Sequence, residues 1–387
     1  MKFETRAIRL QAERSAHREH SVPLFPTSSF VFDDAEQMRA VFAGEEKGNL
    51  YSRFTNPNCQ ELEQKIAALE ECDAAVATAS GMSAVVASFL TFLNAGDHLL
   101  ASRAIFGSTH QFILNHLNRW GIEHTFLDAQ DTSEWAAAIR PNTRMLYLET
   151  PSNPRLDIID MAWASDFCKK YDLIYVVDNC LASPYLQQPA RFGADLVVHS
   201  ATKFIDGQGR VLGGLVAGPE VMIDPIRKYC RNTGPALSPF NAWILSKSLE
   251  TLAVRMDRHS SNAEVLADFL TNHSAIAKVN YPFSAHHPAQ AIARKQMRQG
   301  GGIVTFELKG GLDAGRQFLD RLSWLSLTAN LGDTRTIVSH PASTTHAKLT
   351  EEARQLVGIT SGLVRVSVGL EHVDDIMADI EQALVSL

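Results

Sequence analysis

The sequence lacks long apolar runs and blocks of like charge. No uninterrupted apolar run reaches the roughly 18 residues that a membrane-spanning helix needs. The N-terminal stretch MKFETRAIRLQAERSAHREH is also too polar for the hydrophobic region of a secretory signal. Lysine and arginine (36) and aspartate and glutamate (43) are scattered along the chain, giving a net charge of -7 without a basic patch for nucleic acid. We therefore expect a cytoplasmic protein that binds neither membranes nor nucleic acid.

Cysteine is scarce too. The five cysteines are odd in number, widely spaced and without a Cys-x-x-Cys pair, which argues against a disulfide framework and against a zinc site. No acid or cysteine stands at metal-ligand spacing beside the histidines, so no metal is expected. Cys180 lies two residues after Asp178, where a nucleophile is conceivable, but a small buried thiol is the more common reason for such a cysteine.

The chain has enough apolar material for more than one domain. With 387 residues, 45% of them hydrophobic, it predicts a body at 61–256, a second domain at 257–387, and an N-terminal arm at 1–60 that lies against something larger. In the body, apolar runs of strand length alternate with helical periods, which predicts an α/β fold with a mainly parallel sheet. The expected strands are 74–78, 98–101, 124–127, 145–148, 173–177, 196–198 and 214–217, and the expected helices include 109–120, 133–139 and 161–170.

The last third changes to an α+β pattern. One long amphipathic helix around 242–256 is expected to bridge the two domains. After it we expect helices at 263–271, 313–322 and 373–384, strands at 303–308 and 363–368, and a polar loop at 330–336.

Polar residues follow two of the expected strands directly. One apolar run ends at Asp178 and Asn179, and a second ends in 199–203, which contains Ser200, Thr202 and Lys203. Ligands of parallel α/β sheets bind beyond the carboxyl ends of the strands. A lysine, two hydroxyls and an acid suit pyridoxal phosphate, which needs a Schiff-base lysine, phosphate donors and a carboxylate for the pyridinium nitrogen. Each motif alone is a common turn, and only their combination favours a site.

Other positions leave two interpretations open. The strand, turn and helix around 80–83 offer a phosphate cradle, although tight turns use glycine for conformational reasons as well. Asn153 suits either a hydrogen bond to a ligand or a simple turn. Tyr51 and Arg53 could reach one anion, but a structural salt bridge is favoured there. Arg365 interrupts an apolar strand and needs an anionic partner, either a substrate carboxylate or an internal acid.

In this order, the motifs resemble the Cys/Met metabolism family of pyridoxal phosphate enzymes over nearly the whole chain. They are YSR (51–53), SGM (80–82), ETPSNP (149–154), VDN (177–179), HSATK (199–203) and GLVRVSVGLE (362–371). The resemblance implies fold type I, like aspartate aminotransferase, with a seven-stranded sheet and a smaller α+β C-terminal domain. Residues 199–210, 237–243 and 330–336 are most similar to the O-succinylhomoserine sulfhydrylases.

The resemblance also implies roles for individual residues. Lys203 would carry pyridoxal 5'-phosphate as a Schiff base and act as the base, and Asp178 would keep the ring nitrogen protonated. Tyr51, also a catalytic candidate, and Arg53 would reach the cofactor phosphate of the neighbouring subunit, so that at least a dimer and usually a homotetramer is required. The remaining implied contacts are phosphate binding by Gly81, Met82, Ser200 and Thr202, a ring-oxygen contact by Asn153, ring stacking by Phe106, and α-carboxylate binding by Ser339 and Arg365.

The implied activity is γ-replacement in methionine biosynthesis, in which sulfide displaces succinate from O-succinylhomoserine to give homocysteine. Phe106 stands where tyrosine is common in the family and cannot transfer a proton. Together with Ser108, at a position where methionine γ-lyases tend to have cysteine, it disfavours a lyase. The alternatives are O-acetylhomoserine sulfhydrylase, cystathionine γ-synthase, a methionine or homocysteine γ-lyase, and a cofactor-free binding protein, which is disfavoured because every reactive residue is present.

Overall fold

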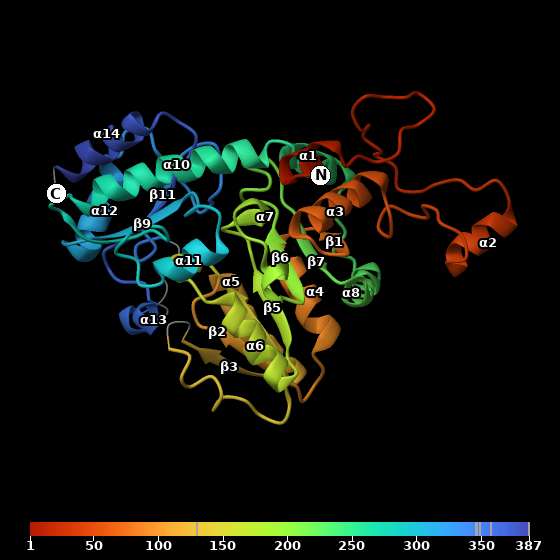
Figure 1. Cartoon of the computed structure of the whole chain (residues 1–387), viewed down its shortest axis with the longest axis horizontal. Coiled ribbons are helices and arrows are strands. Elements are labelled where there is room, and N and C mark those ends of the chain that lie inside the picture. The colour runs from red at the N-terminus through yellow and green to blue at the C-terminus, as the bar shows by residue number, and fades with distance from the viewer. Residues whose placement is uncertain (129–130, 345–346, 348–349, 357, 386–387) are drawn as a thin grey trace.

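The chain forms two sheets that lie side by side along the long axis of the molecule (Figure 1). The computed structural model describes residues 1–128, 131–344, 347, 350–356 and 358–385. Within these residues no helix combines the length and the apolar character needed to cross a bilayer.

The first sheet has seven strands and is parallel except for one member, as the sequence predicts. Only β7 runs against its neighbours, so the other six strands present their carboxyl ends at one edge. In spatial order the strands are β1 (Ala74–Thr78), β7 (Gly214–Gly218), β6 (Leu196–Ser200), β5 (Ile174–Asp178), β4 (Thr143–Glu149), β2 (His98–Ser102) and β3 (Glu123–Leu127).

Helices cover both faces of this sheet, which explains why its strands are continuous apolar runs. On β5, Val176 packs in the core shared with one layer of helices, whereas Tyr175 and Val177 pack in the core on the opposite face, against α6. The first layer contains α4 (Gly81–Phe92), α5 (Gly107–Asn115) and α8 (Glu220–Thr233), and the opposite side carries α3 (Pro57–Glu70), α6 (Met161–Tyr171) and α9 (Pro239–Leu249).

The second sheet has five strands and is mainly antiparallel, which fits the α+β pattern expected for the last third of the chain. Its order is β10 (Ser326–Leu327), β11 (Ile337–Ser339), β12 (Leu363–Ser367), β9 (Ile303–Leu308) and β8 (Ile276–Asn280). Three helices pack in its core: α10 (Leu252–Thr271), α12 (Gly311–Arg321) and α14 (Val373–Leu384). Of the other two helices in this part of the chain, α11 (Gln290–Gln296) packs in the core beside the first sheet through Ala293, and α13 (Glu351–Leu356) precedes β12.

Two predicted helices are wrong. Residues 133–138 form only turns, because the fully buried Trp135 packs against Trp163 and Phe167 of α6 and its Nε1 donates to the Asp128 carbonyl at 2.8 Å. Tertiary packing there overrides the helical period. The single helix expected around 242–256 is split into α9 and α10.

Glu250 and Thr251 separate these two helices. The carboxylate of Glu250, between α9 and α10, accepts from Lys247 at 2.6 Å and from Lys65 at 3.4 Å. The long α10 then runs from the first sheet to the second (Figure 1), and the expected helix 263–271 is its second half. The predicted domain limit between residues 256 and 257 falls inside α10. This limit and the one between residues 60 and 61 stay predictions.

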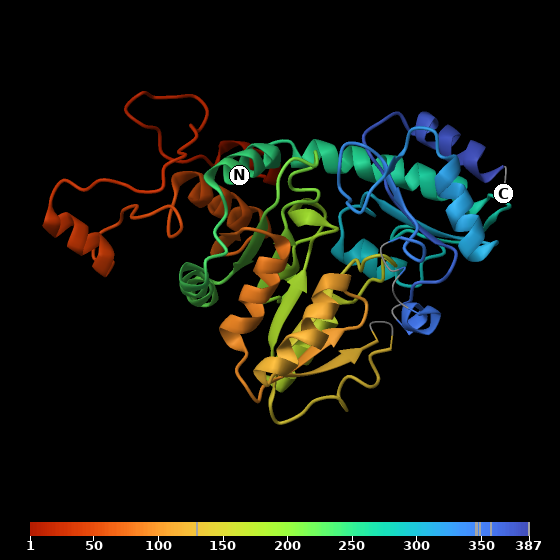
Figure 2. The same ribbon diagram turned by 180° about the vertical axis from the view of Figure 1, so that it is seen from behind.

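The N-terminal segment has two parts. Helix α1 (Phe3–Arg9) packs on α3, where Arg6 Nη1 donates to the Ala68 carbonyl at 2.6 Å. Helix α2 (Ala35–Ala43) projects away from both sheets in either view (Figures 1 and 2) and exposes Met38 and Phe42. Contact of this arm with a neighbouring subunit stays a prediction.

Candidate active site

A pocket of about 1500 Å³ lies beyond the carboxyl edge of the first sheet and extends to β12. Its wall combines the turns after β1, β2, β4, β5 and β6 with residues of the last third of the chain. The predicted site residues that line it are Gly81, Met82, Phe106, Asn153, Asp178, Ser200, Thr202, Lys203 and Arg365. As expected, strand ends that are far apart in the sequence line one pocket.

Asp178 is held in one orientation at the end of β5. Its Oδ2 accepts from the Tyr147 hydroxyl at 2.9 Å, and its Oδ1 accepts from the backbone N–H of Cys180 at 3.0 Å. Burial, followed by the charge of Asp178, raises the pKa of Tyr147, so the phenol remains a donor. Burial likewise raises the pKa of the Cys180 thiol, which disfavours the nucleophile alternative for this cysteine.

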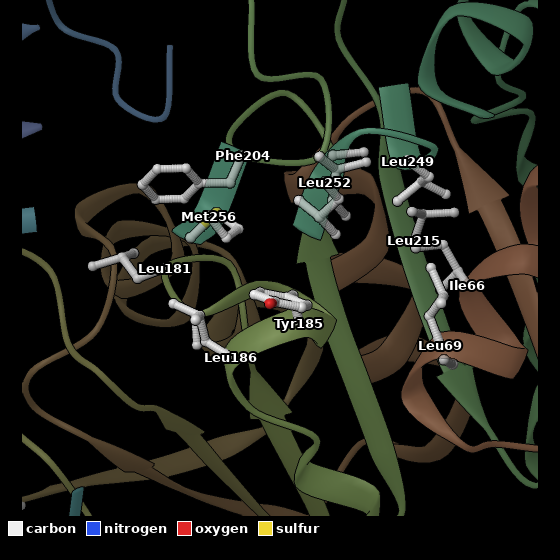
Figure 3. Packing of buried hydrophobic residues seen from close by; sticks show 14 of the residues in the cluster. Ile66, Leu69, Leu181, Tyr185, Leu186, Phe204, Leu215, Leu249, Leu252 and Met256 are labelled. Atoms are coloured by element: carbon white, nitrogen blue, oxygen red, sulfur yellow. The ribbon is translucent and has the colours of Figure 1, made fainter. Parts of the chain in front are cut away.

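Lys203 projects into the pocket from a turn that is fixed in the core. The next residue, Phe204, packs beside Met256 and Leu181 (Figure 3). Arg255 donates to the Phe204 carbonyl at 2.6 Å and to the Ile205 carbonyl at 3.2 Å, which holds the turn from the other side. The Lys203 Nζ donates to Asn330 Oδ1 at 2.6 Å. Burial lowers the pKa of Lys203, which favours the neutral amine that a base or nucleophile needs.

The start of α4 and the end of β6 form an anion cradle. Ser80 caps α4 by accepting from the Ser83 N–H at 3.2 Å, and the N–H groups of the first turn have no acceptor within the helix. A Cβ atom at Gly81 would lie 2.6 Å from the Ser200 Cβ atom, so glycine is required for this close approach. The cradle adds the hydroxyls of Ser200 and Thr202 to a helix N-terminus, which suits a phosphate.

Arg365 enters the pocket from β12. Its Nη1 donates to Asn153 Oδ1 at 2.9 Å and its Nη2 to the Asn330 carbonyl at 3.0 Å, while its buried Nε has no partner among the described residues. Burial lowers the pKa of Arg365 to about 10, and the nearby Glu149 opposes this shift. In the part of the chain that the structure describes, no carboxylate lies within ion-pair distance of Arg365. Its partners are neutral amides, so the internal salt bridge considered from sequence is absent there.

Glu149 is a pocket residue to which the sequence alone assigned no role. Its Oε2 accepts from the backbone N–H of Phe106 at 2.6 Å, which fixes the loop that presents the exposed Phe106 ring to the pocket. Burial and then the charge of Asp178 raise the pKa of Glu149 well above its usual range. The sequence marks 149–154 as a strand end that could face a ligand, but the contact of Glu149 with Phe106 joins residues 43 positions apart and has no local signal.

Three predicted residues lie outside the pocket wall. Ser339 is on β11 and pairs across the sheet with Arg365, with its buried Oγ unpartnered among the described residues. Tyr51 is 43% exposed, and the Arg53 guanidinium donates to the Arg231 carbonyl. Within one chain neither reaches the cradle of Ser200, so their action on a neighbouring subunit stays a prediction.

The described residues contain no group of three or more His, Cys, Asp and Glu side chains that could hold a metal ion, and the five cysteines are free thiols. The donor set instead fits pyridoxal phosphate: a lysine amine of lowered pKa, a buried acid oriented by a phenol, and an anion cradle.

Comparisons with known proteins agree with this fit. Residues 4–385 match the family model for Cys/Met metabolism PLP-dependent enzymes. The chain is 45% identical to an O-succinylhomoserine sulfhydrylase of Pseudomonas aeruginosa, covering 100% of this chain and 96% of the relative. It is also 45% identical to an L-methionine gamma-lyase of Fusobacterium nucleatum, covering 98% of this chain and 97% of the relative.

A solved structure has the same fold. The crystal structure of a putative O-acetylhomoserine (thiol)-lyase from Campylobacter jejuni, which contains N'-pyridoxyl-lysine-5'-monophosphate, matches with a TM-score of 0.95 at 33% identity and covers 100% of both chains.

Proposed function

The chain belongs to the Cys/Met metabolism family of PLP-dependent enzymes, and we propose that within it the protein is an O-succinylhomoserine sulfhydrylase. It would replace succinate by sulfide at Cγ of O-succinylhomoserine and release homocysteine for methionine biosynthesis. Relatives with sulfhydrylase and with γ-lyase activity are equally similar in sequence, so the choice depends on the pocket.

The observation that carries the proposal is the aromatic residue in the pocket wall, Phe106. Its ring can stack on a cofactor, but it has no hydroxyl with which to protonate a leaving group. A γ-lyase acting on methionine must expel a thiolate of high pKa, which needs such a proton. Succinate leaves as a stable carboxylate and needs none. The pocket therefore suits an activated ester better than a thioether.

The roles of the pocket residues follow from their positions. When bound, the cofactor supplies an electron sink that acidifies the Cα and Cβ protons of an amino-acid substrate. Lys203, with its pKa lowered by burial, would anchor the cofactor and then move these protons through Nζ. Asp178 would face the pyridine nitrogen through the orientation imposed by Tyr147. Arg365 would bind the α-carboxylate through its Nε, which has no hydrogen-bond partner among the described residues.

The remaining residue roles belong to the same proposal. Gly81, Met82, Ser200 and Thr202 would bind the cofactor phosphate, and Asn153 would contact the cofactor ring oxygen. Ser339, opposite Arg365 in the second sheet, would assist binding of the α-carboxylate.

Tyr51 and Arg53 would complete the cradle of an adjacent subunit, which makes a homotetramer of active-site-sharing dimers the expected assembly. The exposed position of Tyr51 and the projecting arm support this arrangement. The N-terminal arm, the cofactor-binding body and the C-terminal domain are the expected units, and a cytoplasmic location is part of the proposal.

The test is product analysis of the holoenzyme. O-succinylhomoserine, O-acetylhomoserine and methionine are each supplied with and without sulfide or cysteine, and homocysteine, cystathionine and 2-oxobutyrate are quantified. The proposal requires homocysteine from the succinyl ester and sulfide to be the fastest reaction. Faster formation of 2-oxobutyrate from methionine would establish a γ-lyase, and faster cystathionine formation would establish a cystathionine γ-synthase.

A further inference from the structure

The pocket contains a second arginine that has no role in the proposed chemistry. Arg103 is the first residue after β2, and its backbone N–H donates to the Leu127 carbonyl at the end of β3, at 2.8 Å. Its side chain is half-buried and lines the same pocket as Lys203 and Arg365. The backbone of a cationic residue is therefore fixed in the wall of the substrate-binding space.

The guanidinium of Arg103 lacks a partner in the described parts of the chain, where no hydrogen bond, ion pair or aromatic ring engages it. A partly buried charge without a counterion is costly unless a ligand supplies the anion. His110 and Glu149, which line the same pocket, do not supply one. The pKa of His110 in the pocket wall is lowered by burial and then by the charges of His124 and Arg103. His110 and His124 are therefore basic groups and supply no anion. The Glu149 carboxyl group instead accepts from the Phe106 backbone N–H, and burial, followed by the charge of Asp178, raises its pKa.

The cofactor phosphate is not the missing anion. Its cradle lies at the ends of β1 and β6, whereas Arg103 follows β2. In the sheet order, β5 and β4 separate β6 from β2. With neighbouring strands about 4.8 Å apart, the ends of β6 and β2 are separated by roughly 14 Å. The two anion-binding ends of the pocket are therefore distinct.

We infer that Arg103 binds the distal carboxylate of the acyl group of the substrate and so selects a dicarboxylic ester. The inference rests on the proposed function. O-succinylhomoserine carries an α-carboxylate and a terminal succinyl carboxylate, and the pocket offers one guanidinium for each, Arg365 and Arg103. O-acetylhomoserine and methionine have only the first carboxylate. The planar guanidinium can hold a carboxylate through two parallel hydrogen bonds, which lysine cannot reproduce.

The experiment compares the holoenzyme with Arg103→Met and Arg103→Lys, and Arg119→Met serves as the matched control because Arg119 is exposed and outside the pocket wall. The substrates are O-succinyl- and O-butyrylhomoserine, which are matched in length but differ in the terminal carboxylate. Arg103→Met should lower kcat/KM for the succinyl ester by about 10- to 100-fold and leave the butyryl ester within about twofold. Arg103→Lys should fall between the wild type and Arg103→Met, and Arg119→Met should match the wild type.

Binding of free succinate and butyrate to each protein, measured by calorimetry, gives a readout that does not depend on turnover. The wild type should bind succinate more tightly than butyrate, and Arg103→Met should lose that difference. Equal binding of the two acids by the wild type, or an equal loss of activity on both esters in Arg103→Met, would overturn the inference. If Arg103→Met does not fold, the inference is still tested by Arg103→Lys and by the succinate and butyrate affinities of the wild type. A wild type that prefers methionine would refute the proposed function, whereas a wild type with succinyl preference that Arg103→Met retains would refute only the role of Arg103.

Discussion

Glu70 is a buried carboxylate whose removal should weaken both the fold and the cofactor site. It is the last residue of α3 and is fully buried. Its Oε1 accepts from His199 Nε2 at 2.5 Å and from Asn179 Nδ2 at 2.9 Å. These donors directly adjoin Ser200 and Asp178, so one carboxylate oxygen ties together the two strand ends that carry the candidate phosphate and ring-nitrogen contacts.

The magnitude of the effect follows from the partners that remain after Glu70→Ala. His199 would lose the hydrogen bond of Nε2, and its Nδ1 is already buried without a partner among the described residues. Asn179 would keep a second bond, from its Nδ2 to the Gln187 carbonyl at 2.9 Å. The His199 donor left without an acceptor costs about 1–3 kcal/mol, and the lost bond of Asn179 adds about 1 kcal/mol, so the expected loss is about 2–4 kcal/mol. That is a large fraction of the 5–15 kcal/mol by which native proteins are typically stable. Glu70→Gln keeps an acceptor oxygen and should lose less.

Urea unfolding of the apoprotein, followed by tryptophan fluorescence, measures this loss, and the dissociation constant for pyridoxal phosphate measures its effect on the site. Glu71→Ala is the matched control, because among the described residues the ion pairs of the neighbouring Glu71 are the surface ones with Arg6 and Arg191, each worth about 1 kcal/mol or less. Glu70→Ala should unfold at lower urea than Glu71→Ala and bind the cofactor more weakly. Equal unfolding midpoints for the two variants would refute the argument.

Three further perturbations test the site and the fold. Lys203→Ala should lose both turnover and the near-visible absorbance of the covalently bound cofactor, and a coloured, active variant would contradict the assignment. Phe106→Tyr supplies the missing hydroxyl and should raise 2-oxobutyrate formation from methionine relative to homocysteine formation from the succinyl ester by about 10-fold or more, as quantified by product analysis. Burial lowers the pKa of His259 to about 4 from 6.5, so the folded state keeps it neutral while the unfolded chain takes up a proton. Stability should therefore fall as the pH drops from about 6.5 to about 4, by at most about 1.4 kcal/mol per pH unit from this group, and unfolding midpoints for His259→Gln should show a shallower slope.

The sequence predicted those parts of the candidate site whose signal is local. Asp178 and Lys203 each follow an apolar run at a strand end, and parallel strands bring such ends to one edge of a sheet. The start of α4 was recognisable for the same reason, because a strand, a small-residue turn and a helix follow each other directly. The fold class followed from the alternation of strand-length apolar runs with segments of helical periodicity.

The remaining features depend on contacts between residues far apart in the chain. Glu70 meets His199 across 129 positions and Lys203 meets Asn330 across 127, so no window of sequence contains both partners. Trp135 illustrates the opposite failure: a local helical period was present, but burial of the indole against α6 decided the backbone. Arg103 gave no signal at all, since an arginine after a strand is ordinary until its lack of a partner is visible.

The two sheets depend on each other for the site. The first sheet supplies the amine of Lys203 and the acid of Asp178, and the second supplies the guanidinium of Arg365. Asn330 lies between them, because its side-chain oxygen accepts from Lys203 while its backbone carbonyl accepts from Arg365. A substrate carboxylate bound to Arg365 would therefore lie near Asn330, the residue that also positions the Lys203 amine. The separation between Arg365 and Lys203 consequently depends on how the two sheets are placed relative to each other, and the sequence of neither sheet alone sets it.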